Sequence, residues 1–419
     1  MINKASAEDQ LKQLTSLVHQ LGVFIEWLDN AHTEQTPRGL VQLLANLISR
    51  MNPGTKVVAR PQAKNNYSIL DLGKVLKRLV EDYIPHSKQS SFSEYLSVPV
   101  KLISFPRIQR DNILAHAIFG HELGHPIADD YLEQEKGDPA HIEKHKEIKK
   151  QVDGIVQKKL ANIDVDEGQK LVFTTQTFDR ILQIRKRALQ ELISDAVGIM
   201  IFGPSAFFAC YELFWSGNLD AKPAHEEWYP PSRMRLRLML ELMEKLDFPA
   251  KFNLISKVNN IDGYIFAVNA FIDDVKQLVV TTSDQNGINL DPELKLAYDW
   301  MNESLKNAIE YATKKTKEVA FKSDEIFQQL PELLQRLEIG IPPNEVGDPE
   351  DPVIVDCMSS LLSAWLYKLQ GVNPKTGETL SDDEVDRLHQ KTLSGIEYVI
   401  LQDSYRRYLG DAQSEKGVA

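Results

Sequence analysis

Apolar residues recur at three- and four-residue spacing through most of this chain, and this period limits the fold more than any other feature of the sequence. Such spacing places side chains on one face of an α-helix, whereas the residues of a half-buried strand alternate. The pattern predicts a fold that is mainly α with a small β-sheet. Helices are expected over about 6–22, 36–51, 67–84, 110–125, 178–202, 232–246, 292–318, 324–338, 353–370 and 382–409.

The clearest strand pattern is SVPVKLIS, residues 97–104, where Val98, Val100 and Leu102 share one face. Pro99 has no N–H to donate to a ladder, so this strand is expected at a sheet edge or to begin there. An edge strand can bind an extended peptide by main-chain pairing. The strand is therefore either a substrate-binding edge or an ordinary core strand.

With 419 residues the chain exceeds one typical core, which predicts two or three domains. The segment IGIPPNEVGDPEDP, residues 339–352, combines Pro, Gly and acids as linkers do, and a lesser break falls at 51–66. The charged segment 133–151 is expected to be solvated, with its histidines His141 and His145 at the surface. The predicted parts are an N-terminal helical region (1–90), a catalytic core (91–250), a helical extension (251–340) and a C-terminal helical module (341–419).

Charge and composition exclude several classes of partner. Sixty acidic against 48 basic side chains give a net charge of −12, which disfavours nucleic-acid and anionic-membrane binding. The uncharged run 196–211 is too short to cross a bilayer, and Gly203-Pro204 divides it, so we expect two buried helices meeting at a turn. The polar N-terminal segment and the two cysteines, Cys210 and Cys357, which lie far apart and allow at most one disulfide bridge, favour a cytoplasmic protein. The sequence does not predict an oligomeric state.

Residues 121–125 read HELGH, the H-E-x-x-H pattern. Two imidazoles four residues apart on a helix differ by about 40° in direction and roughly 6 Å in height, so both can bind one ion. Glu122 points about 100° away, toward a water on that ion, as a general base requires. Asp111 is the expected N-cap, and Pro126 is expected to kink or end the helix just after the motif.

A second helical segment, QELISDAVG at 190–198, places two carboxylates on an otherwise apolar face. A buried carboxylate is costly unless it is paired, protonated or bound to a metal. In one interpretation Arg187 or another cation neutralises Glu191 and Asp195, or the face lines water. In the other, Glu191 is the third metal ligand and Asp195 accepts the outer N–H of a ligand histidine.

Other zinc arrangements fit less well. A metzincin has Gly and His three and six residues after the motif, but Ala128 and Tyr131 stand there. Asp129 or Asp130 could supply a third ligand, yet neither has a supporting motif around it.

HELGH followed by E-x-x-S-D resembles the gluzincins, the thermolysin-like zinc peptidases. The resemblance implies a zincin-like core, a Zn²⁺ ion held by His121, His125 and Glu191, Asp195 orienting a histidine, and Glu122 as the base. HELGH, ELISDA and the downstream PPSRMR are similar to the branch with Ste24-like CAAX-prenyl endopeptidases and their soluble relatives. The resemblance covers about residues 97–245.

Amide hydrolysis also needs a donor for the tetrahedral oxyanion. Members of that branch often carry His-Pro followed by Arg, whereas Tyr229 precedes Pro230 here. Tyr229 or His225 could donate to the oxyanion, and Arg233 is the expected cation. Alternatively, the segment is a helix start capped by Ser232 and followed by solvated arginines.

The sequence therefore predicts a zinc-dependent peptidase that hydrolyses peptide bonds of a peptide or protein through a zinc-bound water activated by Glu122. The alternative is a catalytically inactive metallopeptidase-like interaction or sensor protein with a structural zinc site. The intact Glu122 favours the enzyme, because structural zinc needs no base. An accidental motif on a helical scaffold would bind no metal.

Overall fold

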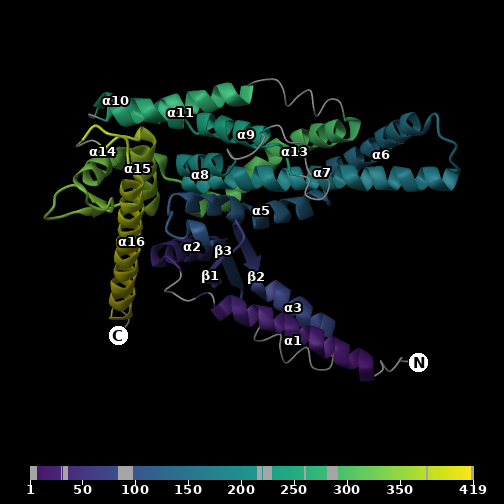
Figure 1. Ribbon diagram of the computed structural model, residues 1–419, viewed down its shortest axis with the longest axis horizontal. Helices are drawn as coiled ribbons and strands as arrows, with labels where there is room; N and C mark the ends of the chain where they lie inside the picture. The colour runs from purple at the N-terminus through teal and green to yellow at the C-terminus, as the bar shows by residue number, and fades with distance from the viewer. Residues whose placement is uncertain are drawn as a thin grey trace. The chain divides into compact units, whose positions relative to one another are not determined.

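A computed structural model describes residues 7–29, 31, 36–83, 98–214, 219, 229–258, 261–280, 291–373 and 376–416. These residues are mainly helical, with one three-stranded and one two-stranded sheet, which confirms the predicted fold class (Figure 1). They form two compact units. The first unit comprises 1–116, 332–364 and 373–419, and the second comprises 117–331 and 365–372. These boundaries differ from the predicted four parts, because both ends of the chain join one unit.

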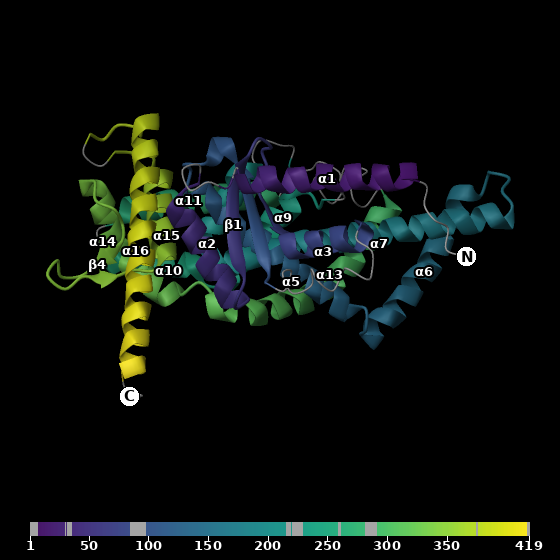
Figure 2. The same ribbon diagram turned by 90° about the horizontal axis from the view of Figure 1, so that it is seen from below.

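The first unit is built on the three-stranded sheet, in the order β1-β3-β2. Strand β3 is parallel to β1, with Lys56 opposite Val100, and antiparallel to β2. Helix α2 packs against β1 (Figure 2), and α3 packs against β3. The elements are α1 (Ala7–Asp29), α2 (Arg38–Met51), β1 (Lys56–Gln62), β2 (Ser68–Asp71), α3 (Leu72–Tyr83), β3 (Val100–Pro106) and the 3₁₀ helices η1 (Arg107–Gln109) and η2 (Ala115–Ile118).

Of the two positions expected for this strand, a sheet edge or a start at Pro99, the structure has the second, and β3 is the central strand of its sheet. Pro99 lies just before the first ladder residue, Val100, and its carbonyl accepts from Lys56 N at 2.8 Å. The strand thus begins after the proline, and the missing N–H interrupts neither ladder. With neighbours on both sides, β3 has no free edge for a peptide, so its proposed substrate-binding role is withdrawn.

The C-terminal part of the first unit contains a short hairpin and a long helix. Strand β4 (Glu345–Val346) lies in the segment expected to be a linker and pairs with β5 (Val353–Ile354), which follows that segment directly. Helix α16 (Asp382–Lys416) packs on α2, where Gly39 N donates to Glu397 Oε1 at 3.0 Å. Helices α14 (Ser323–Ile339) and α15 (Cys357–Gln370) each contain a boundary between the units.

Helix α7 (Glu167–Phe202) is the central element of the second unit, and α5, α6, α8, α9 and α13 pack on it (Figure 1). It begins with a capping box in which Asp166 and Gln169 satisfy each other's backbone N–H groups. The other elements are α5 (Phe119–Glu135), α6 (Pro139–Leu160), α8 (Pro204–Phe214), α9 (Ser232–Lys245), α10 (Phe248–Val258), α11 (Asp262–Val280), α13 (Pro292–Thr316) and η3 (Lys317–Val319).

The apolar run 196–211 folds as expected. Helix α7 ends at Phe202, Gly203 adopts φ 57°, and α8 begins at Pro204. A residue with a Cβ rarely adopts this conformation, and Pro suits the first position of a new helix. Two buried helices therefore meet at a turn. No helix among the described residues combines the length and apolar character that a membrane span requires.

The helix that carries HELGH differs from the expected one at both ends. Two 3₁₀ helices precede it, and α5 begins only at Phe119, so Asp111 is not its N-cap. It continues through Pro126 to Glu135. Pro126 removes only the donor to the Glu122 carbonyl, and packing on α7 and α13 holds the rest of the helix. The motif therefore lies at the N-terminal end of its helix and not at the C-terminal end.

Candidate metal centre

Helices α5 and α7 touch through their backbones at the HELGH motif. A Cβ built on Gly124 would lie 2.4 Å from Ser194 Cα, and one on Gly120 would lie 2.8 Å from Gly198 Cα. Only glycine allows such an approach. The glycines thus place the side chains of the two helices within reach of one another. The four-residue spacing of Gly120 and Gly124 is the sequence signal that indicates this crossing.

The three predicted ligands meet at this crossing. His121, His125 and Glu191 each offer a ligand atom, and these atoms all lie within 4.8 Å of one another. His121 Nε2 is 3.3 Å from Glu191 Oε2, and the two imidazole rings are 4.8 Å apart and nearly perpendicular. This cluster could hold a metal ion.

Asp195 fixes the orientation of His121. The carboxylate is fully buried, and its Oδ1 lies 2.8 Å from His121 Nδ1. Arg235 donates to both Asp195 oxygens at 2.7 Å. Because Nδ1 faces Asp195, the nitrogen of His121 that faces Glu191 is Nε2. Burial opposes the charge on Asp195, but Arg235 outweighs it and holds the pKa of Asp195 well below its ordinary value.

His125 is oriented by the facing helix, because its Nδ1 lies 3.2 Å from Ser194 Oγ. The two histidines have opposite electrostatic environments. Burial lowers the pKa of His125 to about 4, with a smaller contribution from the charge of His121. Burial would also lower the pKa of His121, but the hydrogen bond and charge of Asp195 raise it to about 9.

Two arginines form ion pairs with Glu191. Arg187 Nη2 lies 3.1 Å from Oε1, and Arg235 Nη1 lies 3.3 Å from Oε2. Burial would raise the pKa of Glu191, but the hydrogen bond from His121 and the charge of Arg235 lower it to about 2. The expected neutralisation of the buried carboxylates by Arg187 or another cation is thus present, together with the ligand cluster.

Two further observations indicate that these donor atoms fit a divalent cation. Glu191 Oε1 is buried and, although Arg187 Nη2 lies 3.1 Å away, it accepts no hydrogen bond of good geometry from the described residues, so it has a lone pair to give. Two ligand atoms on a tetrahedral zinc, with bonds of roughly 2.0–2.2 Å, lie about 3.4 Å apart. The 3.3 Å between His121 Nε2 and Glu191 Oε2 matches that spacing.

Glu122 is half-buried beside the cluster on α5. Burial raises its pKa to about 7, and the negative charge of Glu191 adds to this, against the opposing charge of His121. A carboxyl group with this pKa can hold or release a proton near neutral pH, as a general base and acid must.

The expected oxyanion donors are placed differently. Tyr229 is 37% exposed, and its hydroxyl accepts a hydrogen bond from Arg187, whose guanidinium lies 4.3 Å from the centre of its ring. Arg187 therefore links Tyr229 to Glu191. His225 lies outside the described residues.

The arginine that reaches the buried carboxylates is Arg235, whereas Arg233 donates to the carbonyl of Leu278 at the end of α11. Residues 233 and 237 are four apart and share a helix face, and Arg237 donates to the neighbouring carbonyl of Val279. Residue 235 projects about 200° away, toward α7. The cation beside the buried carboxylates is therefore Arg235 and not the expected Arg233, because the helical period directs residue 235 toward α7. The solvated-arginine alternative is also wrong for Arg233 and Arg235, which are both buried.

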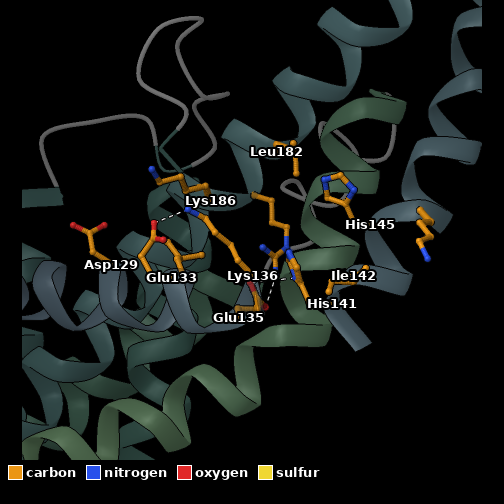
Figure 3. A pocket seen from close by; sticks show the side chains of 12 residues that line it. Asp129, Glu133, Glu135, Lys136, His141, Ile142, His145, Leu182 and Lys186 are labelled. Atoms are coloured by element: carbon orange, nitrogen blue, oxygen red, sulfur yellow. Dashed lines mark hydrogen bonds and ion pairs between the residues drawn. The ribbon is translucent and has the colours of Figure 1, made fainter. Parts of the chain in front are cut away.

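A pocket of about 790 Å³ lies farther along the same two helices, bounded also by α6. Its inner wall carries a buried ion pair, in which Arg185 donates to Glu135 at 2.6 Å (Figure 3). The ring of His141 stacks on that of Trp300, with the two ring centres 5.5 Å apart, and His145 lies beside His141. Both histidines are half-buried and line the pocket, so the prediction of a solvated pair at 141 and 145 is wrong.

Asp129, considered as a third ligand, instead accepts a hydrogen bond from Gln190 at 2.6 Å.

Comparisons with models of protein families, with curated proteins and with solved structures found no match to this chain.

Proposed function

We propose that this chain is a zinc metallopeptidase of the gluzincin type, with a zincin-like core in which His121, His125 and Glu191 hold the zinc ion. The convergence of these three side chains, from two helices about 70 residues apart in sequence, is the observation that supports this most strongly. H-E-x-x-H with a downstream Glu is a set of ligands typical of catalytic zinc, which keeps one position open.

Zinc bound there would supply Lewis-acid chemistry, lowering the pKa of a water and polarising the scissile carbonyl. Glu122 is the proposed base. Its carboxylate takes a proton from the attacking water and returns it to the nitrogen of the leaving amine. A pKa of about 7 supports both transfers at neutral pH, because neither protonation state is strongly favoured.

Asp195 and Arg235 position the ligands in this proposal. Asp195 fixes the tautomer of His121, and Arg235 holds Asp195 and Glu191 in their ionised forms. Tyr229 is the proposed oxyanion donor. Its hydroxyl oxygen accepts from Arg187, which leaves the phenolic hydrogen to donate toward a substrate oxygen.

The proposed substrate is a peptide or protein. The pocket beside α5 begins at Asp129, one helical turn after His125, and so lies within a few residues' reach of an extended peptide bound at the cluster. It is large enough for one or more substrate side chains. A cytoplasmic location is also part of the proposal, because Cys210 and Cys357 are buried free thiols.

A second candidate is a non-catalytic role for the same residues. The two arginines already balance the charges of Glu191 and Asp195, so the cluster is also consistent with a structural ion-pair network or an inactive zinc site. A network without metal predicts no zinc in the purified protein. An inactive zinc site predicts zinc without turnover.

The test compares zinc content and cleavage in three variants. His121→Ala is expected to lose zinc and activity, whereas Glu122→Gln keeps zinc at one per chain and loses at least about a hundredfold of turnover. Glu310→Gln, at an exposed glutamate on α13 outside the lining of the pocket, is the matched control and should behave as wild type. Activity is measured by mass spectrometry of peptide libraries. Cleavage by Glu122→Gln at the wild-type rate would exclude Glu122 as the base.

A further inference from the structure

Helix α1 presents a continuous apolar stripe to solvent on the first unit (purple in Figures 1 and 2). Each of its six members is between 40% and 67% exposed. They follow one another at alternating spacings of three and four residues and are Leu11, Leu14, Val18, Leu21, Ile25 and Leu28. This 3.5-residue repeat is the seam of a two-stranded coiled coil, and not the broader apolar face of a helix that packs on a core.

The opposite face of α1 is used by its own unit. Ser16 and Gln20 hydrogen-bond to Tyr83 of α3, and Arg60 of β1 lies 4.7 Å from the centre of the Trp27 ring. At 100° per residue, these inward positions point roughly 140° away from the exposed stripe. Contact with the unit therefore fixes α1 as a helix and leaves the stripe directed outward. A preformed helix loses little further entropy when a partner binds.

We propose that this stripe joins two copies of the chain through a parallel coiled coil of α1 with α1. The residue types support this partner. Position d of the heptad is Leu at 14, 21 and 28, and position a is Leu11, Val18 and Ile25, of which the last two are β-branched. This is the combination that favours parallel two-stranded coils.

The flanking positions favour the same partner. Between Leu11 and Leu28 the e and g positions are Thr15, Leu17, Gly22 and Phe24, so no like charges face each other across the seam. An anionic membrane is a poorer partner. Helices that lie on membranes carry Lys and Arg on the polar face. Helix α1 has one Lys against four acidic side chains.

The first experiment measures mass by sedimentation equilibrium from about 1 to 100 μM chain, a range suited to a seam of under three heptads. The 47.6 kDa chain is expected to dimerise in this range. Val18→Glu and Leu21→Glu should each weaken dimerisation at least about tenfold, because the new charge would be buried twice. Gln13→Glu, on an exposed position of the same helix outside the seam, is the matched control. A wild-type monomer at 100 μM, or a dimer that neither glutamate weakens, would overturn the proposal.

Cysteine cross-linking tests the orientation. In a parallel coil each d residue faces its own copy, so Leu14→Cys and Leu28→Cys should both form intermolecular disulfides, and Gln13→Cys should not. In an antiparallel coil centred on the seam the two copies of residue 14 would be roughly 16 Å apart. Both native cysteines are buried and give little background. Cross-linking confined to Val18→Cys and Leu21→Cys, or binding of the monomer to anionic vesicles, would contradict the parallel dimer.

Discussion

Gly124→Ala should disrupt the crossing on which the candidate metal centre depends. The added Cβ would lie 2.4 Å from Ser194 Cα, 3.0 Å from Ser194 Cβ and 3.1 Å from its carbonyl oxygen. Ordinary contacts begin near 3.4 Å, so the helices must separate locally by about an ångström. The obstacle is backbone in the middle of α7, which no rotamer change can move.

The expected change in the free energy of unfolding of Gly124→Ala follows from two opposing effects. Alanine is favoured over glycine in a helix by roughly 1 kcal/mol, whereas overpacking typically costs about 1–3 kcal/mol, and backbone clashes lie at the upper end. A net loss of about 1–2 kcal/mol in the free energy of unfolding is expected. Zinc affinity should fall at least about tenfold, because His125 and Glu191 lie on the two helices that separate.

Two other glycines provide matched controls. A Cβ on Gly154, in α6, meets nothing within 4 Å, so Gly154→Ala should stabilise the protein by up to about 1 kcal/mol. Gly198→Ala adds a Cβ at ordinary contact distance, 3.4 Å from His121 N, and should be tolerated. Urea denaturation followed by circular dichroism, with zinc competition against a chelator, measures both quantities. If Gly124→Ala unfolds at the wild-type midpoint and binds zinc as tightly as wild type, the close approach of α5 and α7 is refuted.

Three further substitutions test other parts of the structure. Asp195→Asn leaves Arg235 buried without its main partner, so it should cost about 3–5 kcal/mol of unfolding free energy and weaken zinc binding about 10- to 100-fold. A change below 1 kcal/mol in urea denaturation would contradict this. Burial lowers the pKa of His116 to about 4 in the folded protein, so the unfolded state binds a proton first as the pH falls below about 6.5. This residue should therefore remove about 3 kcal/mol of stability between pH 6.5 and 4, a loss that His116→Phe should abolish when unfolding is measured across that range. Arg185→Met should cost about 3–5 kcal/mol by removing the main cationic partner of buried Glu135, which would keep only its longer contacts with Tyr131 and His141, and adding Glu135→Leu should recover most of that loss in a double-mutant cycle. Additive losses in the double variant would show that the pair is not coupled.

The ligand residues could be predicted because H-E-x-x-H restricts geometry over one helical turn. His121 and His125 share a face in any helix, and the two acids at 191 and 195 stand out on an apolar face. The ends of α5, the helix that contains HELGH, could not be predicted in the same way. Packing on α7 and α13 stabilises α5 beyond Pro126, and local propensity contains no information on that packing.

Strand β1 and one arginine were missed for different reasons. Strand β1 contains Arg60 and Pro61 and lacks alternation, and it is defined by pairing with β3, more than 40 residues later. Pairing over such distances is not visible in local periodicity. Arg235, by contrast, could have been chosen from the sequence, because Arg233 and Arg237 lie four residues apart on another face of α9.

The pocket histidines show how a charged segment can mislead. The neighbours of His141 and His145 are charged and exposed, yet both rings pack against aromatic side chains, Trp300 for His141 and Phe178 for His145. Trp300 is more than 150 residues later in the chain, on α13. The charge pattern correctly described one face of α6, but it could not reveal the elements that cover the other.

The central claim is that one divalent cation contacts two imidazole nitrogens and one carboxylate oxygen. Anomalous diffraction at the zinc edge from crystals of the zinc-loaded protein tests it directly. We expect a single strong peak at roughly 2.0–2.2 Å from His121 Nε2, a His125 nitrogen and a Glu191 oxygen. A zinc peak elsewhere, or a zinc-saturated crystal in which Glu191 remains bound only to Arg187 and Arg235, would contradict it.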